Sequence, residues 1–97
     1  MSDIEVRHDR EARRFFTVID GKEAYLAYAD AGDGTLDYRH TFVPPALRGR
    51  QVAKLLVAAA FDHARANDLR VIPTCSYVAK QVERHPEYRE LTVRATG

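Results

Sequence analysis

Apolar and polar residues alternate over much of the first 43 residues, as is typical of strands in a partly covered sheet. Ile4 and Val6 alternate with charged neighbours and predict a short edge strand. Further strands are predicted at 15–19 and 22–29. Asp20–Gly21 lies between them and favours a type I′ hairpin turn, in which both central residues need positive φ.

A second cluster of turn residues at 30–34 precedes another predicted strand at 35–43. The start of the chain therefore predicts an antiparallel meander. If this strand alternates regularly, one of its faces carries Leu36, Tyr38, His40 and Phe42.

The hydrophobic period changes after Pro44 and Pro45, which end the strand because proline cannot donate to a sheet ladder. Apolar residues then recur at helical spacing and predict a helix over about 50–67. A short apolar run at 69–73 predicts another strand. The order strand, helix, strand predicts a right-handed crossover with parallel pairing.

The last part of the chain reads as helical. Ser76 is a candidate cap for a helix over 77–84, which His85–Pro86 should end. A final helical turn from Pro86 would direct Tyr88 and Leu91 inward, and residues 94–97 are expected to fray. We therefore predict an α+β fold of helices layered on a mixed sheet, in which the meander is followed by a β-α-β crossover and a C-terminal helix.

Composition narrows the possible functions. The chain has 97 residues, which fits a single domain spanning 1–97. Its 15 basic and 14 acidic side chains give a net charge of +1, which argues against nucleic-acid binding. One cysteine excludes an internal disulfide, and no cluster has metal-ligand spacing. We expect the reducing cytoplasm and no membrane partner, since no signal pattern or long apolar run is present.

The segment that joins the third long strand to the helix carries the most chemistry. A helix N-terminus offers unpaired amides and partial positive charge, and Gly49 lets the backbone approach a ligand closely. Arg48, Arg50 and Lys54 add positive charge. No acidic residue occurs between Asp37 and Asp62 to cancel it. The segment predicts a site for a compact, multiply charged anion such as a pyrophosphate.

Arg48-x-x-Gln51-x-Ala53 resembles the pyrophosphate loop of the GNAT superfamily of N-acetyltransferases, whose pattern is Arg/Gln-x-x-Gly-x-Gly/Ala. Two later segments, 71–78 and 83–88, resemble a branch of small GNAT-like proteins that carry Pro-x-Cys-x-Tyr-Val and His-Pro-x-Tyr. Gln51 occupies a position where the family usually has glycine. A glutamine at a helix start need not require positive φ, so we expect an altered site that still binds.

The resemblance implies a domain of GNAT fold that transfers an acetyl group from acetyl-CoA to an amine. Strand residues Thr41, Phe42 and Val43 would pair with the pantetheine arm, as an added strand would. The backbone amides of the loop would hold the pyrophosphate. The implied binding residues of this loop are Arg48, Gly49, Arg50, Gln51, Val52, Ala53 and Lys54.

Three side chains are candidates for the chemistry. His40 could accept the proton of the amine, or it could simply lie on a half-covered strand. Cys75, at a helix start, could take the acetyl group, protonate the departing thiolate or be structural. Tyr77 could donate to the thiolate or carbonyl, or be a core tyrosine. Neighbouring parallel strands would bring His40 and Cys75 to one side of the cleft.

Two functions from other classes stay open. The GNAT helices that wall the acceptor site have no clear counterpart except 10–14, so a second subunit or a protein amine could complete it. The same gap, with Gln51, fits a module that binds CoA or acyl-CoA without transferring it. The second of these functions is a nucleic-acid-binding module that uses Arg39, Arg48, Arg50 and Lys54. The sequence lacks the row of stacking aromatics that such a module would use.

Overall fold

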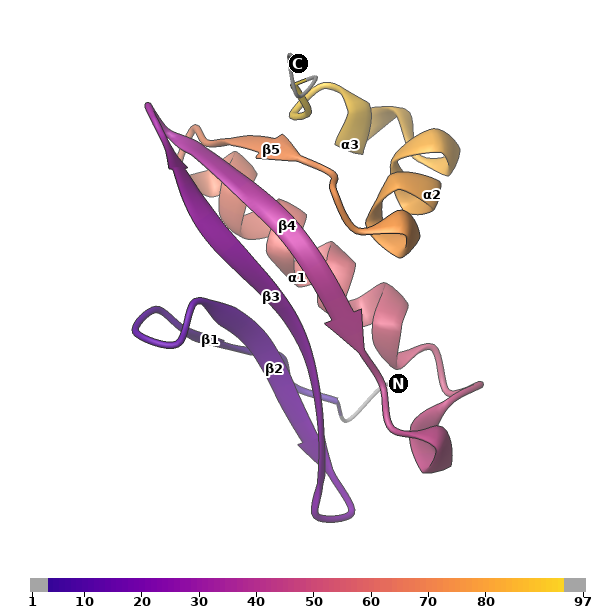
Figure 1. The fold of residues 1–97 in the computed structure, drawn as a ribbon. Coiled ribbons are helices and arrows are strands. Elements are labelled where there is room, and N and C mark those ends of the chain that lie inside the picture. Colours follow the sequence, from indigo (N-terminus) through magenta and orange to yellow (C-terminus); the bar gives the residue numbers. More distant parts are fainter. Residues whose placement is uncertain (1–3, 94–97) are drawn as a thin grey trace.

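The fold is one five-stranded mixed sheet with helices on one face and along one edge (Figure 1). The computed structural model describes residues 4–93. The strands follow chain order across the sheet: β1 (Arg7–Asp9), β2 (Arg14–Ile19), β3 (Lys22–Gly32), β4 (Thr35–Phe42) and β5 (Arg70–Ile72). The helices are the 3-10 turn η1 (Pro45–Leu47), α1 (Val52–Ala66), α2 (Ser76–Arg84) and α3 (Pro86–Arg89).

The antiparallel meander is confirmed, with one shift at its start. Asp20 and Gly21 both have positive φ, 52° and 74°, as the predicted hairpin turn requires. The edge strand expected around Ile4 and Val6 instead occupies β1, where it pairs antiparallel with β2. Ile4 and Val6 lie before that strand and pack against the core.

The crossover is also confirmed. β4 and β5 pair in parallel, with Thr35 opposite Arg70 and Asp37 opposite Ile72. Helix α1 connects them and lies behind the sheet in Figure 1. On its other side β5 forms a parallel bridge between Val71 and Thr92, which ties the end of the described chain to the sheet.

A β-bulge in β4 overturns the predicted face of its second half. Tyr38 pairs with Tyr28 and His40 pairs with Ala27, so Arg39 between them has no opposite residue. The extra residue exchanges the two faces of the strand beyond it. His40 and Phe42 are therefore exposed, on the opposite face from Leu36 and Tyr38, and their rings contact Tyr25.

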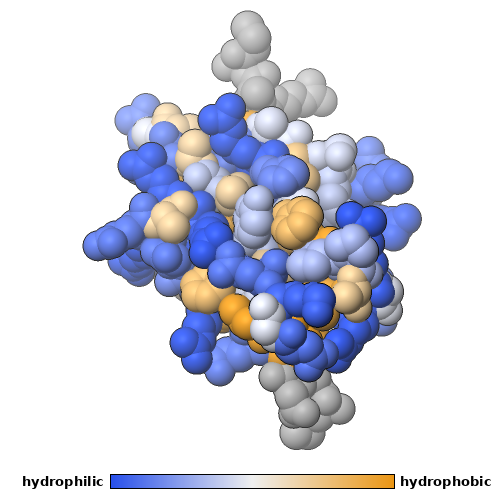
Figure 2. All heavy atoms as spheres, turned by 60° about the horizontal axis from the view of Figure 1, so that its bottom comes forward, coloured by the Kyte–Doolittle hydropathy of each residue, from blue (hydrophilic) through white to orange (hydrophobic). Residues whose placement is uncertain are grey.

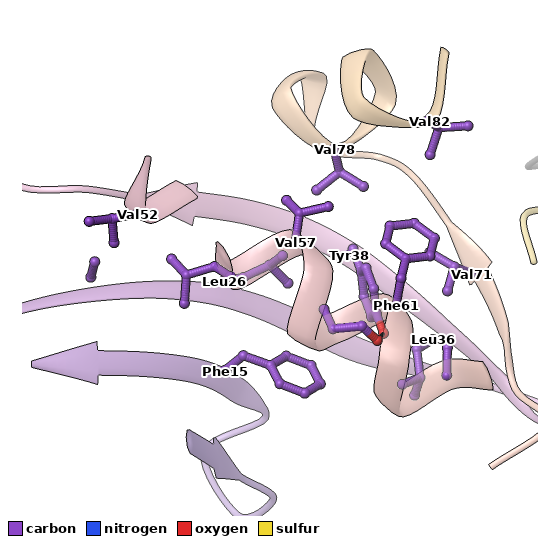
Figure 3. Close-up of a cluster of buried hydrophobic side chains, with 14 of the residues drawn as sticks. Phe15, Leu26, Leu36, Tyr38, Val52, Val57, Phe61, Val71, Val78 and Val82 are labelled. Atoms are coloured by element: carbon purple, nitrogen blue, oxygen red, sulfur yellow. Dashed lines mark hydrogen bonds between the residues drawn. The ribbon is translucent and has the colours of Figure 1, made fainter. Parts of the chain in front are cut away.

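The core lies between the sheet and α1, as Figure 3 shows. Tyr38 is fully buried, and its hydroxyl donates to the carbonyl of Ala60 on α1 at 2.6 Å. Phe61 stacks on Tyr88 of α3 with ring centroids 4.4 Å apart. Tyr88 and Leu91 thus face the core as predicted.

The start of α2 differs from the prediction by one residue. Ser76 is the first helical residue, and the capping position belongs to Cys75, which has extended backbone angles. The predicted stop is confirmed, because His85 ends α2 and Pro86 begins α3. The predicted fraying of 94–97 lies outside the described residues.

The sheet face opposite α1 carries no helix in residues 4–93 (Figure 1). Phe16, Tyr25 and Phe42 are only partly covered there, and Val18 is 57% exposed. Arg14 lies over the rings of Phe16 and Tyr25. Figure 2 shows apolar side chains as separate islands among hydrophilic ones at the end of the molecule that holds the β2–β3 hairpin.

The Tyr38 hydroxyl bond to α1 should contribute measurably to stability. Tyr38→Phe removes a buried donor but keeps the ring, so the free energy of unfolding should fall by about 1 kcal/mol. Denaturant unfolding measures this change. Tyr25→Phe is the control, since its ring is partly exposed. An equal effect of the two substitutions would contradict the role given to the Tyr38 bond.

Candidate functional site

A wedge opens between β4 and β5 because their pairing is short. The pairing of the two strands ends at Asp37 and Ile72, and Pro73 then turns the chain away from β4. The amide of Cys75 then donates to the carbonyl of Tyr38 at 2.9 Å. Past the bulge β4 continues to Phe42, and no strand of residues 4–93 pairs with it on this side. An exposed strand edge next to a wedge can bind an extended chain.

The loop between β4 and α1 uses left-handed backbone at two positions. Gly49 has φ 85°, and Gln51 has φ 61° as the residue that caps α1. We expected that a glutamine at this helix start need not require positive φ, but Gln51 adopts it. For a non-glycine residue this conformation costs roughly 1–2 kcal/mol. The loop thus has the backbone shape for which glycine is normally chosen, although a side chain is present.

The first turn of α1 has free donors. The first hydrogen bond of the helix runs from the amide of Leu55 to the carbonyl of Gln51 at 3.2 Å. The amides of Val52, Ala53 and Lys54 precede it and bond to no carbonyl in the described part of the chain. The first turn has no acidic residue. These amides and the helix dipole can bind an anion.

A cavity of about 280 Å³ lies against this helix start. It gathers most of the loop residues predicted from the sequence, together with Val43 and Tyr77 from outside the loop. Leu47, which sequence reasoning missed, also lines it; the signal was a large apolar side chain directly before the Arg48–Gly49–Arg50 run. The lining residues are Val43, Leu47, Arg48, Gly49, Gln51, Val52, Ala53, Lys54 and Tyr77.

The three basic side chains of the loop have different surroundings. Arg48 donates from Nε to the carbonyl of Val43 at 3.2 Å, and Lys54 lines the cavity. Arg50 instead bonds to the carboxylate of Asp20 at 3.4 Å, in an exposed ion pair. The expectation that no acid neutralises the loop is thus wrong at Arg50, because the β2–β3 hairpin brings an aspartate from 30 residues away.

Cys75 lies across the wedge from β4. Its Sγ is 3.5 Å from Oγ1 of Thr41, and the side chain is partly buried. Burial raises the pKa of the thiol. Hydrogen bonds from the Thr41 side chain and from the amides of Val78, Tyr77 and Thr41 together lower it by more, so the net pKa is below its ordinary value. The thiolate, which is the nucleophilic form, is therefore easier to form at Cys75 than at an ordinary cysteine.

Tyr77 and His40 have contrasting positions. Tyr77 lines the loop cavity, and burial raises its pKa, so the hydroxyl keeps its proton at neutral pH. His40 pairs with Ala27 and contacts Tyr25 on the uncovered face. The expected pairing of His40 with Cys75 is wrong, since the bulge places Thr41 beside the thiol. The role of His40 as a base stays a prediction.

Comparison with known proteins gives the family. Residues 14–91 match the family model described as GCN5-related N-acetyl-transferase. The chain belongs to the GCN5-related N-acetyltransferase family. This membership supports the predicted enzyme class, an N-acetyltransferase, and the predicted fold.

Relatives of this acetyltransferase chain are similar along most of their length. Protein NATD1 of Xenopus tropicalis is 42% identical over 87 residues, which cover 88% of this chain and 80% of that protein. Protein NATD1 of Danio rerio is 41% identical over 91 residues, covering 90% and 83%. The NMR solution structure of a GCN5-like protein from Staphylococcus aureus superposes with a TM-score of 0.74 at 26% identity, over 99% of this chain and 94% of that one.

Two further findings limit what this acetyltransferase fold contains. Within residues 4–93, no group of three or more His, Cys, Asp or Glu side chains is arranged to hold a metal ion. Of the helices described, none is long and apolar enough to cross a membrane.

The Thr41 hydroxyl should control the reactivity of Cys75. Thr41→Val keeps the side-chain shape but removes a hydrogen bond that favours the thiolate, so the pKa of Cys75 should rise. The rate of alkylation by iodoacetamide, measured against pH, should shift to higher pH in this variant. Thr92→Val is the control, because that hydroxyl bonds to Arg89 instead. A profile unchanged by Thr41→Val would refute the assigned contact.

Proposed function

We propose that the protein is an acetyl-CoA-dependent N-acetyltransferase in which Cys75 contacts the reacting thioester. The observation that carries this proposal is the continuity of two features. The start of α1 and the end of β4 adjoin at the loop cavity, which Val43 and Tyr77 both line. Thr41, two residues earlier on the unpaired edge of β4, contacts the Cys75 thiol. Acetyl-CoA has matching parts: a pyrophosphate, an extended amide-bearing arm and a terminal thioester.

The residues present fit this cosubstrate. The amides of Val52, Ala53 and Lys54 would hold the pyrophosphate with the Arg48 and Lys54 side chains, since backbone donors at a helix start suit phosphate oxygens. The edge residues Thr41 to Val43 would pair with the amides of the pantetheine arm as a neighbouring strand does. No metal is needed, because cationic side chains and amides supply the positive charge.

The chemistry assigned to Cys75 is nucleophilic. Its thiolate forms a bond from Sγ to the acetyl carbonyl carbon, and the bond from that carbon to the CoA sulfur breaks, so that CoA leaves as a thiolate. A neutral amine then bonds to the same carbon, the bond to Sγ breaks and the amine gives its proton to a base. His40 is the candidate for that base, and because its ring lies on the uncovered face beside Tyr25, it would serve an amine that approaches from that face. Tyr77 can donate its hydroxyl proton to the departing CoA thiolate.

The acceptor side of the site is open. The sheet face around Tyr25, His40 and Phe42 is not covered by a helix in residues 4–93. A bulky acceptor such as a protein amine could therefore reach the thioester, or a second copy of the chain could complete the site. We place the reaction in the reducing cytoplasm because the cysteine must stay free.

The same open face supports a second candidate function. A module that binds CoA or acyl-CoA would use the loop and the β4 edge but would need no acceptor wall. It differs from the transferase in one property: it binds the cosubstrate and produces no acetylated amine.

Acetyl-CoA should stabilise the protein through the loop. At about 100 times the dissociation constant the gain is about 2.7 kcal/mol, measurable as a thermal shift. Arg48→Ala removes a charge-assisted contact worth roughly 1.5–3 kcal/mol, so the dissociation constant should rise at least about tenfold. Arg89→Ala, an exposed arginine on α3, is the matched control. No shift with acetyl-CoA or free CoA would refute both candidate functions.

Cys75→Ala should lower turnover on an amine panel while leaving the affinity for acetyl-CoA nearly unchanged. Intact-mass spectrometry without amine should show one acetyl group on the wild-type protein and none on the variant. If Cys75→Ala lowers turnover but the wild-type protein is never found acetylated, Cys75 acts as an acid that protonates the departing thiolate and not as a nucleophile. Full activity of Cys75→Ala would remove Cys75 from the mechanism.

A further inference from the structure

A second basic groove lies at the other end of α1 from the loop. It has a volume of about 510 Å³ and is formed by the turn after β1, the end of β3 and the last turn of α1. It does not overlap with the residues of the candidate active site. The lining residues are His8, Arg10, Arg13, Tyr28, Asp30, Leu36, His63, Asn67 and Leu69.

The two arginines of this groove are available for a ligand. Arg10 and Arg13 are exposed in the turn between β1 and β2. Neither guanidinium forms a hydrogen bond or ion pair with any residue from 4 to 93, although four other ion pairs form elsewhere in that range. Two unpaired guanidinium groups facing one groove are typical of oxyanion recognition.

The acids near the groove are few and already engaged. Asp30 is the one acid in the lining, and its Oδ1 accepts from the amide of Gly32 at 2.8 Å. Asp9, close by, accepts from the amide of Ala12 at 3.0 Å. With neutral histidines the lining carries two arginines and one aspartate, and Asp9 close by offsets the second arginine. Each protonated histidine then gives the groove a net positive charge.

The two histidines are held in a fixed arrangement. His8 stacks on Phe15 with ring centroids 4.2 Å apart, and its Nε2 lies 2.6 Å from the hydroxyl of Tyr28. The ring of His63 meets the edge of His8 at 4.4 Å. The side-chain amide of Asn67 lies 3.4 Å from Nδ1 of His63 and bonds to its carbonyl at 2.9 Å. The polar groups are thus positioned before any ligand arrives.

Both histidines resist protonation in the free protein. Burial lowers the pKa of His8, and the neighbouring His63 and Arg10 lower it further, against a smaller opposite effect of Asp9. Burial and then Arg10 lower the pKa of His63. A bound anion would offset both penalties, because negative charge near an imidazole favours its protonated form. Ligand binding and proton uptake should therefore be coupled.

We propose that this groove is a binding site for a doubly charged phosphate group, free or carried on a small metabolite. The donors are the Arg10 and Arg13 guanidinium groups with the rings of His8 and His63. Together they offer more N–H groups than the two oxygens of a carboxylate can accept, whereas a phosphate group presents three or four oxygens. The site is separate from the loop that takes the pyrophosphate, so it does not depend on the proposed acetyl transfer.

The pH dependence follows from the coupling. The pKa of each histidine is higher in the complex than in the free protein, so affinity rises as pH falls below the pKa values of the complex. Sulfate keeps its double charge over this range and therefore reports the histidines alone. Asp9, Asp30, Tyr28 and the two arginines are the other charged or titratable groups facing the pair.

The test is an NMR titration of the His8 and His63 ring protons in the whole protein. In sulfate or phosphate, compared with chloride at equal ionic strength, the pKa of both rings should rise by about one unit. Glycerol 2-phosphate tests whether a carried phosphate binds as free phosphate does. The double variant Arg10→Gln/Arg13→Gln should lose the shift, and Arg89→Gln, matched in residue type and exposure, should keep it.

Three results would overturn this proposal. The first is equal histidine pKa values in sulfate and chloride. The second is an undiminished shift in the double variant whose circular dichroism shows it folded. The third is a response confined to the amides of residues 49–54, which would assign the anion to the loop. The first two outcomes leave acetyl-CoA binding untouched, and the third would support the loop as an anion site. Acetyl-CoA binding itself is measured separately with Arg48→Ala.

Discussion

Tyr38 is bonded in two directions, and the open wedge depends on both bonds. Its buried hydroxyl fixes β4 to the carbonyl of Ala60 on α1, and its own carbonyl receives the amide of Cys75. The strand is thus fixed at the last point before the bulge, where the chain after β5 leaves the sheet. If β4 were free to straighten, it could continue to pair with the segment that follows β5 and so close the space that the proposed cosubstrate needs.

The fold could be predicted largely from local patterns, and the exception has a physical reason. Asp20–Gly21 marks its hairpin, and the helical spacing of apolar residues marks α1, because both signals lie within a few positions. The bulge at Arg39 carries no such signal. Tyr38, His40 and Phe42 look like one continuous aromatic face in the sequence, and only pairing with β3 shows that the face changes between the first and the second of them.

The candidate site divides in the same way. The loop motif predicted a helix start with amides free for a ligand, since the residues that build it are adjacent in the chain. Contacts between distant residues were not predictable: Arg50 meets Asp20, and Thr41 meets Cys75 at a separation of 34 residues. Both depend on how strands are placed side by side. The choice between His40 and Thr41 as the neighbour of the thiol could be made only once β4 had been placed.

Gln51 loses less conformational entropy on folding than the glycine that is usual at its position. Glycine is flexible in the unfolded chain and in a loose loop, whereas a residue with a side chain has fewer conformations to lose. Gln51 is already left-handed in the folded chain, at φ 61°. The free-energy cost of that conformation therefore lowers the stability of the fold and does not reduce the affinity for a ligand. The folded chain therefore already holds the amides at the start of α1 in place, and a ligand would not have to order them first.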